Sequence, residues 1–245
     1  MRKLKSISFS SDGYKLKGYL HLPEDNSAHP PVVVGSHGLF STGNSPKQIA
    51  LAQTCSSLGI AYFRFDHRGC GESEGIFSRV TSLESRSHDL HSAVSTIVTL
   101  TGSDEAIGLF GSSMGGATCL NVARDLQVSA IVAYASPIRL DTTISEDDLP
   151  VELKQTDPRP EPFKLQFDLS ERIEGVGKIL IVHGDADPVI PFSDAVEIHR
   201  RISSPKQLIL LRDGDHPMSR KHHQIEFLQA ATMWFKNRLL PHSSG

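Results

Sequence analysis

The sequence has little of several features that point to specialised classes of protein. It has only three cysteines, Cys55, Cys70 and Cys119, at unrelated spacings, which argues against a disulfide framework and against a tetrahedral metal site. Its formal charge is only −3, from 25 basic and 28 acidic residues, so no strong field attracts nucleic acid or an anionic membrane. We therefore expect reduced, buried thiols and neither kind of partner.

Long apolar runs are missing as well. No stretch is long enough to cross a bilayer. The N-terminal residues 1–8 begin with charge and then alternate polar and apolar side chains, a pattern that lacks the apolar core of a signal peptide. The sequence therefore predicts a cytoplasmic protein. Its 245 residues suffice for one α/β domain with a large core.

What the chain does contain is a rhythm of short apolar runs separated by helix-length segments. This alternation predicts a mostly parallel sheet with helices on both faces. Residues 6–9 and 14–22 alternate around Ser11-Asp12-Gly13 and predict an antiparallel hairpin at the N-terminal edge. A helix is predicted from about Thr81 to Leu100, with a capping box formed by Thr81 and Glu84. The apolar runs are residues 32–34, 61–65, 106–110, 130–134, 178–182 and 207–211.

Residues 137–177 interrupt this rhythm. The segment is too long for an ordinary connection and too polar at its start for another strand of the sheet. Because it follows a strand ending near Ala135, it reaches the sheet edge where ligands bind in open α/β folds. We expect one domain over residues 1–245, with residues 137–177 as a small irregular cap; the alternative is a surface excursion. The side chains expected to roof a pocket are Leu149, Val151, Phe163, Leu165 and Phe167.

The most informative motif is GSSMG at residues 111–115, a G-x-S-x-G that follows an apolar run and opens a stretch of small residues. In this context the motif predicts a nucleophile elbow, in which Ser113 sits on a sharp strand-to-helix turn. The N–H of Met114 then lies at a helix N-terminus and faces an incoming anion. We expect Ser113 rather than Ser112 to be the nucleophile, because Ser112 lacks the flanking glycines at the required offsets and suits a turn position.

A serine hydroxyl needs a histidine base that is oriented by a carboxylate. Two later loops, each following an apolar run, supply these groups. HGDADPVIP at residues 183–191 holds Asp185 and Asp187, and RDGDHP at residues 212–217 holds His216. The order serine, aspartate, histidine is the one found in α/β-hydrolases.

Over nearly its whole length the chain resembles the α/β-hydrolase superfamily. The resemblance rests on GSSMG, HGDADPVIP and DGDHPMS, on PVVVGSHGLF, which is similar to the family's oxyanion strand and loop, and on FRFDHRGCGESEG, which is similar to its Asp-x-Arg-Gly-x-Gly-x-Ser turn. HGLFSTGN and the small middle insertion resemble small serine esterases of the cinnamoyl and feruloyl esterase kind. The resemblance implies the α/β-hydrolase fold.

It also implies roles for individual residues. Ser113 would be the nucleophile, His216 the general base, and Asp187 the acid that orients it; Asp185 is the competing acid and is otherwise expected to bond local amides. The backbone N–H groups of Met114 and Leu39 are the expected oxyanion donors.

Related esterases carry an aromatic directly after His-Gly, whereas here Leu39 comes first and Phe40 second. Phe40 therefore remains an alternative donor, and we also expect it to bind substrate.

Other polar groups near these motifs are expected to be structural. His37 and His183 are predicted to hold the backbones of their loops. The turn from Asp66 to Ser73 is predicted to be an ion-paired turn around Arg68. His222 and His223 are adjacent on a predicted helix and are expected to be exposed to solvent.

These observations predict a serine hydrolase that cleaves a carboxylic ester of a small or aromatic acid through an acyl-enzyme. Its partner would be a small-molecule ester, and the chemistry requires no metal or organic cofactor. Three alternatives remain open. They are a peptidase or thioesterase with the same triad, a non-hydrolytic enzyme such as a perhydrolase or lyase, and a binding protein that has retained the scaffold.

Overall fold

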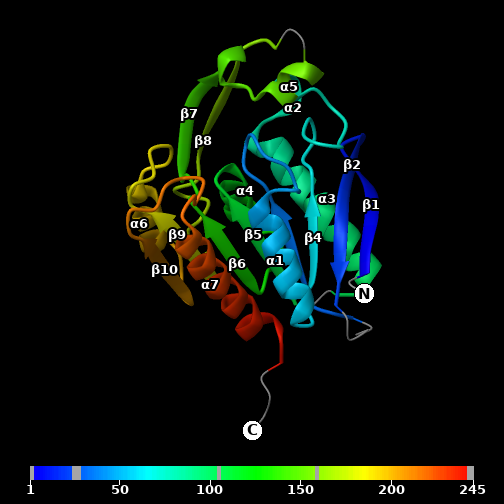
Figure 1. Cartoon of the computed structure of the whole chain (residues 1–245), viewed down its shortest axis with the longest axis vertical. Coiled ribbons are helices and arrows are strands. Elements are labelled where there is room, and N and C mark those ends of the chain that lie inside the picture. Colours follow the sequence, from blue (N-terminus) through cyan, green and yellow to red (C-terminus); the bar gives the residue numbers. More distant parts are fainter. Residues whose placement is uncertain (1–2, 24–28, 104–105, 158–159, 242–245) are drawn as a thin grey trace.

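The computed structural model of the chain describes residues 3–23, 29–103, 106–157 and 160–241. Eight strands form one sheet in the order β1-β2-β4-β3-β5-β6-β9-β10 (Figure 1). The six strands from β4 to β10 in this order are parallel, whereas β2 pairs antiparallel with both β1 and β4. The predicted architecture is confirmed. The strands are β1 (Lys3–Ser11), β2 (Tyr14–Leu22), β3 (Val32–Ser36), β4 (Ala61–Phe65), β5 (Ile107–Ser112), β6 (Ala130–Tyr134), β9 (Ile179–Gly184) and β10 (Lys206–Leu211).

The N-terminal hairpin turns at the predicted Asp-Gly pair. Asp12 and Gly13 have φ values of +48° and +84°, so both central residues are left-handed, as the tightest hairpin turns require. The turn sets Ser11 opposite Tyr14 in the ladder between β1 and β2.

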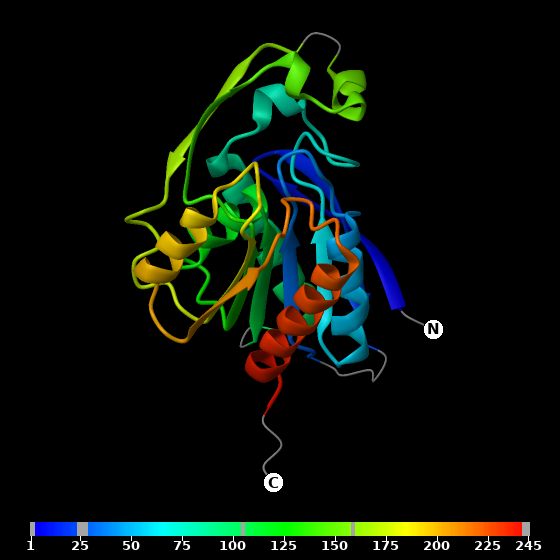
Figure 2. The ribbon, with the colours of Figure 1, turned by 60° about the vertical axis from the view of Figure 1, so that its left-hand side comes forward.

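Helices cover both faces of the sheet, as predicted (Figures 1 and 2). One face carries α1 (Pro46–Ser57) and α7 (Lys221–Leu239), which pack side by side. The other carries α3 (Leu83–Thr101), α4 (Met114–Val122) and α6 (Phe192–Arg201). Every residue of β3, β4, β5, β6 and β9 is buried, because parallel strands covered on both faces need apolar side chains on both sides.

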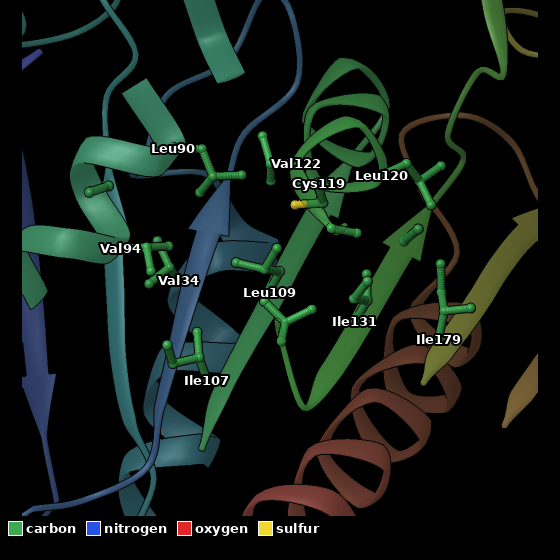
Figure 3. Packing of buried hydrophobic residues seen from close by; sticks show 14 of the residues in the cluster. Val34, Leu90, Val94, Ile107, Leu109, Cys119, Leu120, Val122, Ile131 and Ile179 are labelled. Atoms are coloured by element: carbon green, nitrogen blue, oxygen red, sulfur yellow. The ribbon is translucent and has the colours of Figure 1, made fainter. Parts of the chain in front are cut away.

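Figure 3 shows this packing on the face covered by α3 and α4. Leu109 on β5 and Ile131 on β6 lie beneath Leu90 of α3 and Leu120 of α4. Cys119 is part of the same cluster, and the three cysteines are all buried and unpaired, as expected. In the described residues, no helix is both long and apolar enough to span a membrane.

Helix α3 is capped one residue later than predicted. Its cap is Ser82, whose hydroxyl accepts a hydrogen bond of 3.0 Å from the Ser85 amide, while Ser85 Oγ accepts one of 3.0 Å from the Ser82 amide. Thr81 instead ends the short helix α2 (Phe77–Val80). The prediction favoured Thr81 and Glu84 because glutamate is the usual partner in a capping box, whereas here a second serine takes that position.

The insertion at residues 137–177 is more regular than predicted. It contains β7 (Arg139–Ile144), the 3-10 turn η1 (Glu146–Asp148), α5 (Val151–Thr156) and β8 (Phe163–Asp168); residues 158 and 159 lie outside the described part. β7 pairs antiparallel with β8 in a two-stranded sheet of their own. The polar start that excludes this segment from the main sheet suits a strand with one face in solvent.

The insertion extends beyond one end of the main sheet, with α5 close to α2 (Figures 1 and 2). Leu149 and Leu165 are buried against Phe77 in a separate apolar cluster, and Phe163 packs at its border. Val151, in contrast, is 66% exposed. Phe167 packs against the main core instead.

Candidate active site

Ser113 occupies a strained turn between β5 and α4. Its φ of +53° and ψ of −123° are rare for a residue with a side chain. The turn is tight because the strand and helix touch. A Cβ atom on Gly111 would lie 2.2 Å from the carbonyl oxygen of Gly115, and one on Gly115 would lie 2.1 Å from that of Ser36. Only glycine fits at these two positions, which accounts for the motif. Ser112 is not a turn residue but the buried last residue of β5.

The structure brings Ser113, His216 and Asp187 into one hydrogen-bonded line. His216 Nε2 lies 3.1 Å from Ser113 Oγ, and His216 Nδ1 lies 2.7 Å from Asp187 Oδ2. The Asp187 side chain is fully buried, while that of His216 is 20% exposed. A carboxylate can only accept, so Nδ1 carries the proton and Nε2 is left to accept from the serine hydroxyl.

The acid loop holds Asp187 by both carboxylate oxygens. Oδ1 accepts hydrogen bonds of 2.8 Å and 2.9 Å from the amides of Val189 and Ile190. Oδ2 also lies 3.5 Å from Nε2 of His183, whose side chain is fully buried. The same Nε2 donates a hydrogen bond of 3.0 Å to the carbonyl of Ile190. Burial lowers the pKa of His183, so the ring is a neutral support for the loop, as predicted.

The prediction that Asp185 bonds local amides is wrong, because its side chain reaches across to the loop that carries His216. Its Oδ1 accepts a hydrogen bond of 2.6 Å from the amide of Asp213. The amide of Ala186 also donates to the carbonyl of Gly214 at 3.1 Å. Asp185 therefore ties the acid loop to the base loop, a contact between positions 28 residues apart that no local turn pattern indicates.

Two residues that sequence analysis missed hold the base loop from below. The hydroxyl of Tyr134, the last residue of β6, lies 2.9 Å and 3.0 Å from the carbonyl oxygens of Asp215 and His216. Lys47 Nζ donates to the carbonyl of Pro217 at 3.0 Å and lies 5.2 Å from the centre of the Tyr134 ring. The sequence offered one indication for Tyr134, its position at the carboxyl end of a predicted strand, where ligands bind in open α/β sheets.

The predicted oxyanion loop lies beside Ser113. A Cβ atom on Gly38 would lie 3.6 Å from Ser113 Cβ, and Met114 begins α4 directly after the serine. Among the hydrogen bonds of the described residues, the amides of Leu39 and Met114 donate none. Backbone N–H groups beside a nucleophilic serine can bind a negatively charged oxygen.

Phe40 follows Leu39 in the predicted oxyanion loop and is 41% exposed. Its ring centre lies 5.8 Å from that of Phe77, which in turn lies 5.8 Å from that of Phe163 in the insertion. An aromatic row thus connects the predicted oxyanion loop to the segment that extends beyond the sheet.

Comparison with known proteins assigns the chain to a family. Residues 27–155, more than half of the chain, match the Hydrolase_4 family, described as serine aminopeptidase S33. The chain belongs to this family. The Salmonella typhi protein YfhR is 30% identical to this S33-family chain over 232 residues, which cover 86% of the chain and 74% of YfhR. The human palmitoyl-protein thioesterase ABHD10, mitochondrial, is 28% identical over 219 residues, which cover 78% of this chain and 68% of ABHD10.

A solved structure of Est1E from Butyrivibrio proteoclasticus with ferulic acid bound shares the fold. It matches the S33-family chain with a TM-score of 0.77 at 20% identity, over 95% of this chain and 98% of that one. The predicted membership of the α/β-hydrolase superfamily is confirmed. The S33-family chain is a serine hydrolase enzyme.

His37, in the predicted oxyanion loop, belongs to a buried polar network of the S33-family chain. His37 Nδ1 donates to the carbonyl of Gly38 at 2.8 Å, and its Nε2 accepts from the amide of His67 at 3.1 Å. His67 in turn lies 2.8 Å from Ser36 Oγ and 3.4 Å from Asp89 Oδ2. His37 therefore holds the backbone of its loop, as predicted.

The turn after β4 is ion-paired, as predicted. Arg68 Nε and Nη2 lie 2.9 Å and 2.7 Å from Asp89 Oδ1, and Asp66 accepts hydrogen bonds of 2.7 Å and 2.9 Å from the amides of Gly43 and Glu72. Burial alone would raise the pKa of Asp89, but its bonds to His67 and Arg68 outweigh burial and hold that pKa far below its usual value.

The histidine pair on α7 divides between surface and interior. His222 is exposed, as expected, but His223 is only 2% exposed and its Nε2 donates to the carbonyl of Arg212 at 3.0 Å. The prediction for His223 was wrong because adjacent residues on a helix point about 100° apart, so one of the two faces the sheet.

Two buried histidines should make the S33-family chain sensitive to acid. Burial and the charge of Arg86 lower the pKa of His67 from 6.5 to about 4 and that of His37 well below 6.5. At a pH between the folded and the unfolded pKa of a histidine, the unfolded chain binds more protons than the folded one. The free energy of unfolding should therefore fall as the pH drops from about 6.5 to about 4, by up to about 1.4 kcal/mol per pH unit for each histidine. Urea unfolding followed by circular dichroism at several pH values measures this slope.

The His67→Gln variant should show a shallower slope than the wild type, whatever its stability at neutral pH. The matched control is His222→Gln, which removes an exposed histidine and should keep the wild-type slope. Equal slopes for all three proteins would contradict the expectation.

Proposed function

We propose that the chain hydrolyses carboxylic esters of small or aromatic acids through an acyl-enzyme on Ser113. The observation that carries this proposal is the unbroken line of hydrogen bonds from Ser113 Oγ through His216 to the buried carboxylate of Asp187. This arrangement of donors and acceptors leaves His216 Nε2 facing the serine hydroxyl, as attack by the serine needs.

The reaction begins when Ser113 Oγ attacks the carbonyl carbon of the ester. His216 Nε2 takes the hydroxyl proton, and Asp187 stabilises the imidazolium that forms. The carbonyl oxygen becomes an oxyanion, which accepts hydrogen bonds from the amides of Leu39 and Met114. When the intermediate collapses, the ester C–O bond breaks and His216 returns the proton to the leaving alcohol.

Water then repeats these steps on the acyl-enzyme. His216 takes a proton from the water molecule as it attacks the acyl carbon, and returns the proton to Ser113 Oγ when the acid leaves. The free acid and the original enzyme result. Side chains, backbone amides and water are sufficient for every step, so the proposal includes no cofactor.

The insertion at residues 137–177 would cover the acyl group in this proposal. The support is the row of Phe40, Phe77 and Phe163, which links the oxyanion loop to β8. Aromatic faces pack well on a flat acyl group such as a cinnamoyl chain. The ferulic acid bound to Est1E, a protein of the same fold, agrees with this choice.

A substrate panel tests the proposed preference. We expect kcat/KM for the 4-nitrophenyl esters of acetate and cinnamate to exceed that for the palmitate ester, a palmitoyl thioester and an aminoacyl 4-nitroanilide by about tenfold or more, because the proposed contacts with the aromatic row depend on the shape of the acyl group. The relative named palmitoyl-protein thioesterase makes the thioester the strongest competitor. A kcat/KM that is highest for the palmitoyl thioester would assign a thioesterase, and one that is highest for the anilide would assign a peptidase.

A further inference from the structure

Arg86 is a buried cation that has no carboxylate partner. It lies one turn into α3 and is only 1% exposed. Asp89, on the same helix, pairs with Arg68 instead, and no described carboxylate forms an ion pair with Arg86. Burial lowers the pKa of the Arg86 guanidinium, yet arginine remains charged in proteins. The Asp89 carboxylate attracts the guanidinium only from beyond ion-pair distance, and a buried charge without a direct ion pair is costly, so a specific use for it is expected.

The guanidinium is directed at the backbone of the oxyanion loop. Arg86 Nη2 donates to the carbonyl oxygens of both His37 and Gly38, the second at 3.2 Å. These are contacts between positions 49 and 48 residues apart. The carbonyl of Gly38 also accepts the 2.8 Å bond from His37 Nδ1, so two donors fix its direction.

Fixing this carbonyl fixes an amide. The C=O of Gly38 and the N–H of Leu39 belong to one planar, trans peptide unit and point in opposite directions. With the carbonyl held by Arg86, the Leu39 N–H points away from the guanidinium and has no acceptor among the described residues. The same peptide lies beside Ser113, since a Cβ atom on Gly38 would be 3.6 Å from Ser113 Cβ.

We propose that Arg86 is a positioning residue for the oxyanion hole: it presents the Leu39 N–H to the oxyanion and polarises that peptide with a positive charge that forms no direct ion pair. This inference rests on the proposed function. It favours Leu39 over Phe40 as the second donor, because Arg86 and His37 hold the peptide between Gly38 and Leu39. A cation that bonds the oxygen of a peptide strengthens its N–H as a donor, as in other hydrogen-bonded chains.

The test compares Arg86→Gln and Arg86→Lys with the wild type. Glutamine keeps a neutral donor and lysine keeps the charge. We expect Arg86→Gln to lower kcat for 4-nitrophenyl acetate by about 10-fold to 100-fold, less than the loss of an oxyanion donor itself, with KM changed by less than about threefold. Arg86→Lys should recover part of this loss. Phenylboronic acid, which forms a tetrahedral adduct with a reactive serine, should bind Arg86→Gln more weakly by a similar factor.

Arg64→Gln is the matched control. Arg64 is also buried and donates to a loop carbonyl, that of Gly43 at 3.3 Å, but it has no contact with the peptide of Gly38. We expect this variant to lose thermal stability while keeping the wild-type kcat and boronate affinity. Should Arg86→Gln fail to fold, Arg86→Lys alone decides, because its single ammonium cannot reproduce both bonds and should still lower kcat and boronate affinity.

Two kinds of failure are distinguishable. A wild-type protein that turns over no ester would overturn the proposed function and this inference with it. A wild-type protein that hydrolyses esters through Ser113, together with folded Arg86 variants of normal kcat and boronate affinity, would overturn the inference alone. If Arg64→Gln lost as much kcat and boronate affinity as Arg86→Gln, the losses would reflect a general effect of removing a buried arginine. That outcome would also overturn the inference.

Discussion

Replacing Ser113 with alanine should lower kcat for ester hydrolysis by at least about 10⁴-fold, because the proposed acyl-enzyme forms on Ser113 Oγ, which alanine lacks. The fold should survive this change. Within the described part of the chain, Ser113 Oγ is hydrogen-bonded only to Nε2 of His216, whose side chain is partly exposed. Alanine has the same Cβ atom in the same strained backbone. Steady-state kinetics with 4-nitrophenyl acetate measure the loss, and thermal unfolding measures the stability.

The neighbouring serine provides the control for this substitution. Ser112 is buried at the end of β5 and takes no part in the proposed reaction, so Ser112→Ala should keep kcat within about threefold of the wild type, as for most substitutions that remove no catalytic contact. A Ser113→Ala variant that kept most of its activity would exclude Ser113 as the nucleophile.

The parts of the fold that the sequence predicted are those in which local pattern and burial agree. Strands β3, β4, β5, β6 and β9 are buried on both faces, and this burial requires the short apolar runs that the sequence shows. The nucleophile elbow was predictable for a related reason. Gly111 and Gly115 must be glycine, because a Cβ atom on either would lie within 2.2 Å of a backbone oxygen. A steric requirement of this kind leaves few residue choices, so it is visible in a single sequence.

The insertion was harder to predict because its strands depend on each other. β7 has three consecutive polar residues, and its side chains alternate between exposed and at least partly buried. It would be unstable alone, but it pairs with β8, with Ile144 opposite Phe163 and Arg139 opposite Asp168. Isolated two-stranded ribbons need packing from elsewhere. Here that packing comes from Phe77 in α2, outside the insertion.

Arg86, Tyr134 and Lys47 were missed for a different reason. Each acts through a bond to backbone carbonyls far away in the sequence: Arg86 at Gly38, Tyr134 at His216 and Lys47 at Pro217. A carbonyl acceptor belongs to every residue type, so it leaves no mark in the sequence. The predicted site residues, in contrast, act through particular side chains, so sequence motifs could identify them.

Asp187→Asn should be nearly as damaging as loss of the nucleophile, at about 10⁴-fold in kcat. The amide nitrogen of asparagine would donate to His216 Nδ1, where the carboxylate now accepts at 2.7 Å. The imidazole would then carry its proton on Nε2, facing Ser113, and could not take the serine proton. The side chain volume is unchanged, and an oxygen remains for the amides of Val189 and Ile190, so the loop should keep its shape.

Asp185→Asn is the matched substitution, because it makes the same chemical change two residues away on the same loop. Asp185 Oδ1 accepts from the amide of Asp213, and an asparagine oxygen can accept that bond equally well. We expect its kcat to stay within about threefold of the wild type, since the bond is to the backbone and needs no negative charge. The reverse outcome, with activity lost in Asp185→Asn and kept in Asp187→Asn, would exchange the roles of the two carboxylates and refute the assignment of the acid.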